Sequence, residues 1–72
     1  MIVRVKKRSY RMSKKEYQGL LKVSSENVPF GIYAIEKDGQ AELMNIQCKS
    51  MSELKRYKRT YKEKGFKVYE NK

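Results

Sequence analysis

The sequence contains no histidine, no tryptophan, one proline and one cysteine, and its eight acidic residues face eighteen basic ones. Without histidine, the chain lacks the commonest general acid–base residue and the commonest metal ligand. One cysteine excludes an internal disulfide, and we interpret Cys48 as a small buried hydrophobe in a reducing, cytoplasmic compartment. No apolar run reaches the length of a signal-peptide core or a membrane span, so we expect a soluble protein without membrane contact.

The sequence also lacks the usual signs of a catalytic site. Its four glycines are scattered along the chain, so no phosphate-binding glycine loop is present. The carboxylates fall in helix caps, beside a turn or at outward strand positions, and no general base accompanies Cys48. We therefore predict a protein that is not an enzyme, with no catalytic residue, no metal site and no cofactor.

Positive charge is the outstanding feature of the sequence, and it is unevenly placed. The net charge is +10. Residues 1–15 hold seven cations and no acid, residues 16–48 are acidic on balance, and residues 49–67 are basic again. Such an excess on so small a body attracts polyanions, so the segmental pattern predicts a basic binding surface.

Hydrophobic periodicity and capping signals predict the secondary structure. Alternation of apolar and basic residues indicates one strand over residues 1–12, short or bulged because its inward positions turn polar. Two capping boxes, at 13–16 and 50–53, begin predicted helices that end near Ser25 and Lys64. Gly65 is placed to end the second helix in a left-handed conformation.

Residues 30–48 predict a β-hairpin around Lys37-Asp38-Gly39. A two-residue loop would put amide side chains on the same face as the largest hydrophobes. A three-residue loop with Gly39 left-handed instead places Phe30, Ile32 and Ala34 beside Met44, Ile46 and Cys48, and we prefer this register. It leaves a mixed set of side chains on the opposite face, namely Tyr33, Ile35, Leu43, Asn45 and Gln47.

With a final strand over residues 66–69, the order of elements is β-α-β-β-α-β, which predicts one α+β domain over residues 1–72. The predicted fold is a ferredoxin-like split sandwich: a four-stranded antiparallel sheet with its first and third strands central and two helices on one face. This topology resembles that of RNA-recognition-motif domains. The run from Phe30 to Ile35 is similar to that family's glycine-aromatic signature but falls on the second strand instead of the third, so no family residue is carried over.

In this fold the other face of the sheet is bare. A surface that mixes cations, tyrosines and amides suits single-stranded nucleic acid, because bases stack on aromatic rings and basic groups neutralise phosphate. The predicted face carries Arg4, Lys6, Arg8, Tyr33, Ile35, Leu43, Asn45, Gln47, Lys67 and Tyr69. The predicted second basic surface lies on the last helix and carries Lys55, Arg56, Lys58, Arg59 and Lys62.

Two functions fit this pattern. The first is a small non-catalytic protein that binds nucleic acid, with single strands favoured. The alternative is an adaptor or inhibitor that docks on an acidic surface of another protein. A homodimer through the sheet face is a further expectation, because Ile35 and Leu43 would form an exposed aliphatic pair. In composition, the chain is similar to accessory proteins of bacteriophages and mobile elements.

Overall fold

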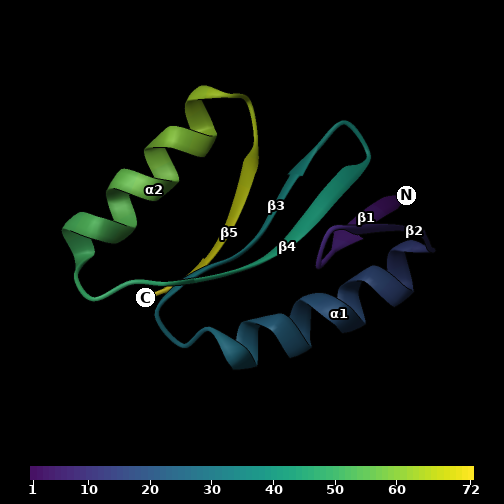
Figure 1. The fold of residues 1–72 in the computed structure, drawn as a ribbon, viewed down its shortest axis with the longest axis horizontal. Helices are drawn as coiled ribbons and strands as arrows, with labels where there is room; N and C mark the ends of the chain where they lie inside the picture. Colours follow the sequence, from purple (N-terminus) through teal and green to yellow (C-terminus); the bar gives the residue numbers. More distant parts are fainter.

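The computed structural model describes all 72 residues, as two helices and five strands in one sheet (Figure 1). The predicted α+β class is confirmed, whereas the number of strands exceeds the prediction by one. Neither helix is long and apolar enough to cross a bilayer. The elements, in chain order, are β1 (Ile2–Val5), β2 (Arg8–Arg11), α1 (Lys14–Asn27), β3 (Gly31–Lys37), β4 (Gln40–Gln47), α2 (Met51–Glu63) and β5 (Lys67–Asn71).

The first twelve residues form a hairpin, so the predicted single strand is wrong. Val5 pairs with Arg8 across Lys6 and Lys7, whose φ angles are 49° and 71°. Two central residues with positive φ make a type I′ turn, whose twist matches that of the flanking strands. The physical reason is the pattern after Val5: a continuing strand would have carried Lys7 and Ser9 into the core, and the reversal keeps both out of it.

The sheet is mixed, with the order β2-β1-β4-β3-β5. Strands β1 and β4 are parallel, and the other neighbours are antiparallel. The predicted four-stranded antiparallel ferredoxin-like sheet is therefore wrong in strand number, order and pairing, and so is the resemblance in topology to RNA-recognition-motif domains. The cause is the N-terminal hairpin: β2 occupies the outer edge of β1, so the last strand pairs with β3 instead.

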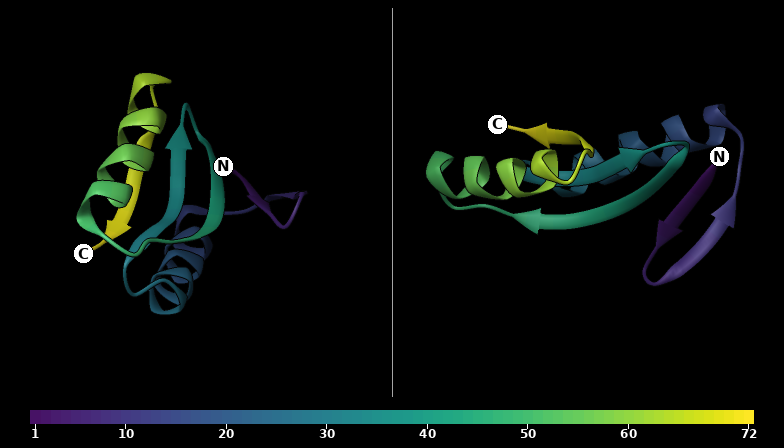
Figure 2. Two further views of the ribbon diagram at one scale, coloured as in Figure 1. Left: turned by 60° about the vertical axis from the view of Figure 1, so that its left-hand side comes forward. Right: turned by 90° about the horizontal axis from the view of Figure 1, so that it is seen from above.

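The two helices lie on opposite faces of the sheet, which corrects the prediction of one shared face (Figures 1 and 2). Each helix connects parallel strands, α1 between β2 and β3 and α2 between β4 and β5. Both connections run toward the β5 edge, but they leave strands that point in opposite directions. Right-handed crossovers of this kind must place their helices on opposite faces.

The core is correspondingly split into two clusters. On the α1 face, Tyr17 packs against Val3 and Ala41, and on the α2 face, Leu54 packs with Ile32 and Ile35. Only nine of the 72 residues are buried. So thin a core gives a domain of this size a stability of about 3–5 kcal/mol.

The β3–β4 hairpin turns through two residues, not the three that were predicted. Lys37 pairs with Gln40, and Asp38 and Gly39 have φ angles of 52° and 78°, which again makes a type I′ turn. The register then shifts between Ile32 and Ala34. Because of this shift, the predicted grouping of Ile32 with Met44, Ile46 and Cys48 is confirmed, whereas Ala34 lies opposite Leu43.

Both helices begin where the sequence indicates. The Ser13 hydroxyl accepts from the Glu16 amide at 3.2 Å, and a Glu16 carboxylate oxygen accepts from the Ser13 amide at 3.4 Å, so the first capping box is complete. At α2, Ser50 accepts from the Glu53 amide at 3.2 Å without the return bond. Helix α1 continues two residues beyond the predicted end, and Gly65 follows α2 with a φ of 88° as expected.

Candidate functional site

Helix α2 covers only part of its face of the sheet. Leu54, which is 1 % exposed, anchors the helix over β3 and β5. Five strands about 4.8 Å apart span about 19 Å, whereas a helix with its side chains is about 10 Å across. The α2 cluster also includes Met44 and Ile46 of β4, so the part of this face that remains open is β1, β2 and the stretch of β4 that pairs with β1, as Figure 2 shows.

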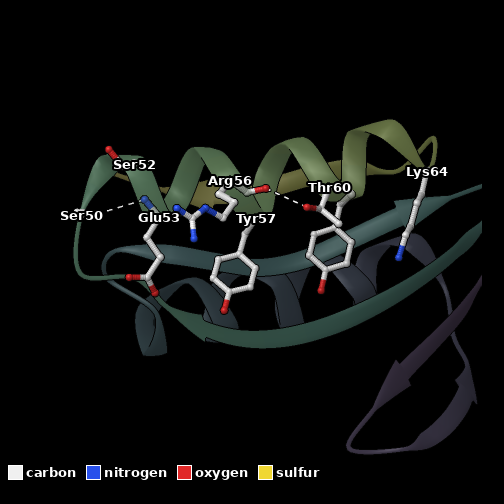
Figure 3. Close-up of a pocket in the computed structure, with 8 residues that line it drawn as sticks. Ser50, Ser52, Glu53, Arg56, Tyr57, Thr60 and Lys64 are labelled. Atoms are coloured by element: carbon white, nitrogen blue, oxygen red, sulfur yellow. Dashed lines mark hydrogen bonds between the residues drawn. The ribbon is translucent and has the colours of Figure 1, made fainter.

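A groove of about 550 Å³ follows the flank of α2 that faces this open part (Figure 3). The side chains of Tyr57 and Lys64 point from the helix toward β4. Tyr57 is 41 % exposed, so much of its ring is available to a ligand. The side chains that matter most along this wall are Glu53, Arg56, Tyr57, Thr60, Tyr61 and Lys64.

A second hollow, of about 210 Å³, continues the groove toward the N-terminal hairpin. The two hollows are neighbours, because Tyr61 of the first and Phe66 of the second meet edge to face with ring centroids 6.3 Å apart. We call the two hollows together the open groove, with the α2 flank as its wall and the open strands as its floor. The floor carries Ile2, Arg4, Ser9, Gln40 and Glu42.

The cations of the N-terminal hairpin have no carboxylate partners. The structure contains three ion pairs, Lys58–Glu70, Arg59–Glu63 and Lys72–Glu70, and none of them involves residues 1–15. All four residues of β2 are exposed. The tip of the hairpin also extends beyond Arg4, the last β1 residue that pairs with β4. This charge is therefore free to meet an external anion.

The turn at the hairpin tip is built from unfavourable residues. A type I′ turn prefers Asn-Gly, because both central residues need positive φ. Lys6 and Lys7 adopt this conformation at a cost of about 1 kcal/mol each. Backbone strain of this kind tends to persist at functional sites, so the turn makes the two ammonium groups candidate binding groups.

The structure does not place the predicted nucleic-acid-binding residues on one face. Arg4 lies on the α2 face, whereas Tyr33 and Tyr69 lie together on the α1 face with ring centroids 6.1 Å apart. The N-terminal hairpin and the register shift beside Tyr33 cause this division. Lys6 is in the turn, and the remaining predicted residues are on the α1 side of the sheet: Arg8, Asn45, Gln47 and Lys67.

Several of these α1-face residues have partners within the protein. The Tyr69 hydroxyl donates to the Glu36 carboxylate at 3.0 Å, and the Lys67 ammonium lies 5.0 Å from the centre of the Tyr69 ring. The Gln47 amide donates to the Asn27 carbonyl oxygen at 2.8 Å, where α1 ends. The Tyr69–Glu36 bond joins β5 to β3, and the Gln47–Asn27 bond joins β4 to α1, so these residues have the structural role that cross-strand packing residues usually have.

Beside Tyr69 and Glu36 lies Tyr17, which is 4 % exposed and whose hydroxyl has no hydrogen-bond partner. Burial raises the pKa of Tyr17, and the neighbouring Tyr69 and Glu36 raise it further. Helix α1 therefore buries a polar group that strongly resists ionisation.

The predicted basic surface of α2 is also divided. Lys55, Arg59 and Lys62 lie together on the outer side of the helix, where Arg59 bonds to Glu63 at 3.1 Å. Lys58 instead pairs with Glu70 of β5 at 2.6 Å. Arg56 is turned into the open groove. Of the five predicted cations, Arg56 alone joins the hairpin charge across the groove.

The spacing of Leu54, Tyr57 and Tyr61 predicts one buried stripe on α2. Tyr61 does pack against the Leu54 cluster, but the helix leaves Tyr57 exposed, so the role of Tyr57 in the groove wall was missed. Burial raises the pKa of Tyr61, and the charges of Glu42 and Tyr57 raise it further. The signal in the sequence was the spacing of four residues between Tyr57 and Tyr61, which makes them neighbours on one side of a helix.

Two other predictions concern Ile35, Leu43 and Cys48. Ile35 is 4 % exposed beneath α2, whereas Leu43 packs on the α1 face, so the exposed pair predicted to join a homodimer does not exist. Cys48 is partly buried in the α2 cluster. Burial and the nearby Glu53 raise the pKa of its thiol, which keeps it in the less reactive protonated form.

No protein-family model matches the chain, and no curated protein or solved structure is matched by it. The functional interpretation therefore depends on the geometry and charge described above.

Proposed function

We propose that this protein is a small non-catalytic nucleic-acid-binding protein that holds a phosphate backbone between its N-terminal hairpin and the flank of α2. The observation that carries the proposal is the hairpin: five of the seven cations of residues 1–15 lie on it, none in an ion pair, with Lys6 and Lys7 at a strained tip. Phosphate neutralisation by such groups supplies sequence-independent affinity.

Electrostatics favours this role for the hairpin. Unpaired cations on a body of net charge +10 repel one another and destabilise the free protein. A polyanion relieves this repulsion when it binds, so folding and binding reinforce each other. Arg56 and Lys64 on the far side of the open groove extend the positive surface across the floor.

The test is fluorescence anisotropy of labelled single-stranded and duplex oligonucleotides across a salt series. The informative variant is Lys6→Asn with Lys7→Gly, which supplies the favoured turn residues while removing two charges. We expect higher stability but weaker binding, with the salt slope for a single strand flattened by about 1.4 because about 0.7 is lost per phosphate contact. Lys22→Gln with Lys49→Gln is the matched control, because it removes the same charge from exposed positions outside the hairpin.

If the control flattens the slope as much as the tip variant, the hairpin has no special role and only total charge matters. Dissociation constants weaker than about 100 μM at low salt for every oligonucleotide would reject the proposed function.

The second candidate function is docking on an acidic surface of another protein. The observation that favours it is that Ile2 and Tyr57 are 39 % and 41 % exposed beside the cations of the open groove. Mixed apolar and cationic surfaces of this kind also suit protein partners. Failure of all oligonucleotides to bind would favour this alternative.

A further inference from the structure

The wall of the open groove carries two tyrosines: Tyr61 packs against the α2 cluster with its edge in the groove, whereas Tyr57 belongs to neither buried cluster. Tyr57 and Tyr61 are four residues apart on α2, so they follow one another along the helix with a rise of about 6 Å. Leu54 is the buried residue that fixes the helix to the sheet, and Tyr57 is 41 % exposed one turn away. A row of aromatic rings at the edge of a positively charged groove is the arrangement that stacks unpaired bases.

We propose that Tyr57 and Tyr61 form a base-stacking site, so that the open groove binds a single strand of nucleic acid in preference to a duplex. This inference rests on the proposed function and names the form of nucleic acid that the groove accepts. The bases of a duplex are already stacked on one another, so the exposed ring of Tyr57 gains contact only from a strand whose bases are free.

The distribution of charge around the tyrosines gives the bound strand an orientation. Glu42 lines the floor together with Phe66, whose ring meets that of Tyr61, and Glu53 lines the same wall as Tyr57. Carboxylates repel phosphate but accept hydrogen bonds from base amino groups. The bases therefore face the tyrosine wall, and the phosphates face the cations of the hairpin.

The absence of tryptophan from the chain makes a direct test possible. Tyr57→Trp introduces a single tryptophan at the proposed site, and Tyr10→Trp introduces one at a comparably exposed position, 46 % against 41 %, on the hairpin. Stacking should quench the indole fluorescence of the Tyr57→Trp protein when a single-stranded oligonucleotide is added, with much less change for a duplex. The Tyr10→Trp protein should show no such difference between the two ligands.

Affinity gives the second measurement. Tyr57→Leu should weaken single-strand binding by about 5- to 150-fold, the loss expected for one stacked base. Tyr57→Phe should bind like the wild type because it keeps the ring, and Tyr57→Leu should bind an abasic strand as well as the wild type does. The salt slope should not change, because no phosphate contact is removed.

The outcomes separate this inference from the proposed function. If oligonucleotides bind but Tyr57→Leu binds the single strand as tightly as the wild type, the stacking site is wrong while the nucleic-acid function stands. An equal loss for duplex and abasic strand would also overturn the stacking site. If no oligonucleotide binds the wild type, the function itself fails and the stacking site fails with it.

Discussion

The two faces of the sheet are covered to different extents, although each carries one helix. On the α1 face, Tyr17 reaches across to Val3 and Ala41, so the helix closes the centre of the sheet. On the α2 face, Leu54 fixes the helix over Ile32 and Ile35 near the β5 edge. The result is one face covered at its centre, with a hollow of about 460 Å³ beside Tyr17, and one face covered near the β5 edge whose far half remains open.

This difference shows how a minimal domain can keep a binding surface while still burying a core. One helix cannot span five strands, because its width is about half that of the sheet. Placing α2 off centre concentrates its burial over β3, β5 and the adjoining side chains of β4, and leaves β1, β2 and the stretch of β4 beside them for contact with a ligand. The cations of the hairpin then lie beyond the open half, away from the buried clusters.

The largest expected difference in the free energy of unfolding is between a substitution on the covered half of the α2 face and one on its open half. Leu54→Ala should destabilise the protein by about 2–5 kcal/mol, because it leaves a cavity where the helix meets the sheet. Ile2→Ala on the open half, where the side chain is 39 % exposed, should cost less than about 1 kcal/mol. Urea unfolding followed by circular dichroism measures both costs, and loss of the native spectrum of Leu54→Ala without urea would mark a cost as large as the stability of the domain. Equal costs for the two variants would show that the open half is as important for stability as the covered half.

The next prediction concerns the backbone between the two faces. A Cβ added at Gly31, whose φ is 153°, would lie 1.8 Å from the Ile46 carbonyl oxygen. Gly31→Ala should therefore separate β3 from β4 and cost about 3 kcal/mol. Gly19→Ala is the control, because nothing lies within 4 Å of the added atom in the middle of α1. It should stabilise the protein by about 0.5–1 kcal/mol in the same unfolding measurement.

The covered α1 face should make stability sensitive to alkaline pH. The pKa of Tyr17 is raised in the folded protein, so the folded state holds its proton more tightly than the unfolded state, whose tyrosines titrate near pH 10. The contribution of Tyr17 to stability should therefore be constant below about pH 10 and be lost as the pH rises further. Tyr17→Phe should weaken this fall without lowering stability at pH 7, because the buried hydroxyl has no partner.

Tyr69→Phe is the matched comparison on the same face. It removes a 3.0 Å hydrogen bond to Glu36 and should cost about 1 kcal/mol at pH 7. A loss at pH 7 for Tyr17→Phe as large as that for Tyr69→Phe would mean that the Tyr17 hydroxyl is bonded after all.

The smallest expected effect compares two ion pairs of α2. Glu70→Gln breaks the Lys58–Glu70 pair, whose side chains are 29 % and 13 % exposed, and should cost about 1 kcal/mol. Glu63→Gln breaks the exposed Arg59–Glu63 pair and should change the unfolding free energy by less than about 0.5 kcal/mol. Similar changes in unfolding free energy for the two variants would show that an ion pair on the sheet-facing side of the helix contributes no more to stability than one on its outer side.

Local features were the most predictable from the sequence. The capping residues Ser13 and Ser50 mark both helix starts, and Gly65 marks the end of α2, because these signals act within a few residues. The turn residues of the β3–β4 hairpin predicted where it lies in the sequence. They did not predict its register, because the shift beside Tyr33 depends on the pairing of β3 with two different strands.

The candidate site was harder to predict because it depends on which edge receives the last strand. A single reversal at Lys6 and Lys7 places β2 on the edge that the predicted fold reserved for β5. That exchange moves α2 to the other face and separates Arg4 from Tyr33. It also brings Tyr57 to the groove, although its spacing from Leu54 indicated a buried position.

The sequence by itself determined the excess of positive charge, its concentration at the N-terminus, the two capped helices and the absence of histidine, because these are properties of composition and short-range spacing. Only the tertiary structure decided which side chains share a surface. In a sheet, every side chain's face depends on register and strand order, and both are set by contacts between residues far apart in the chain.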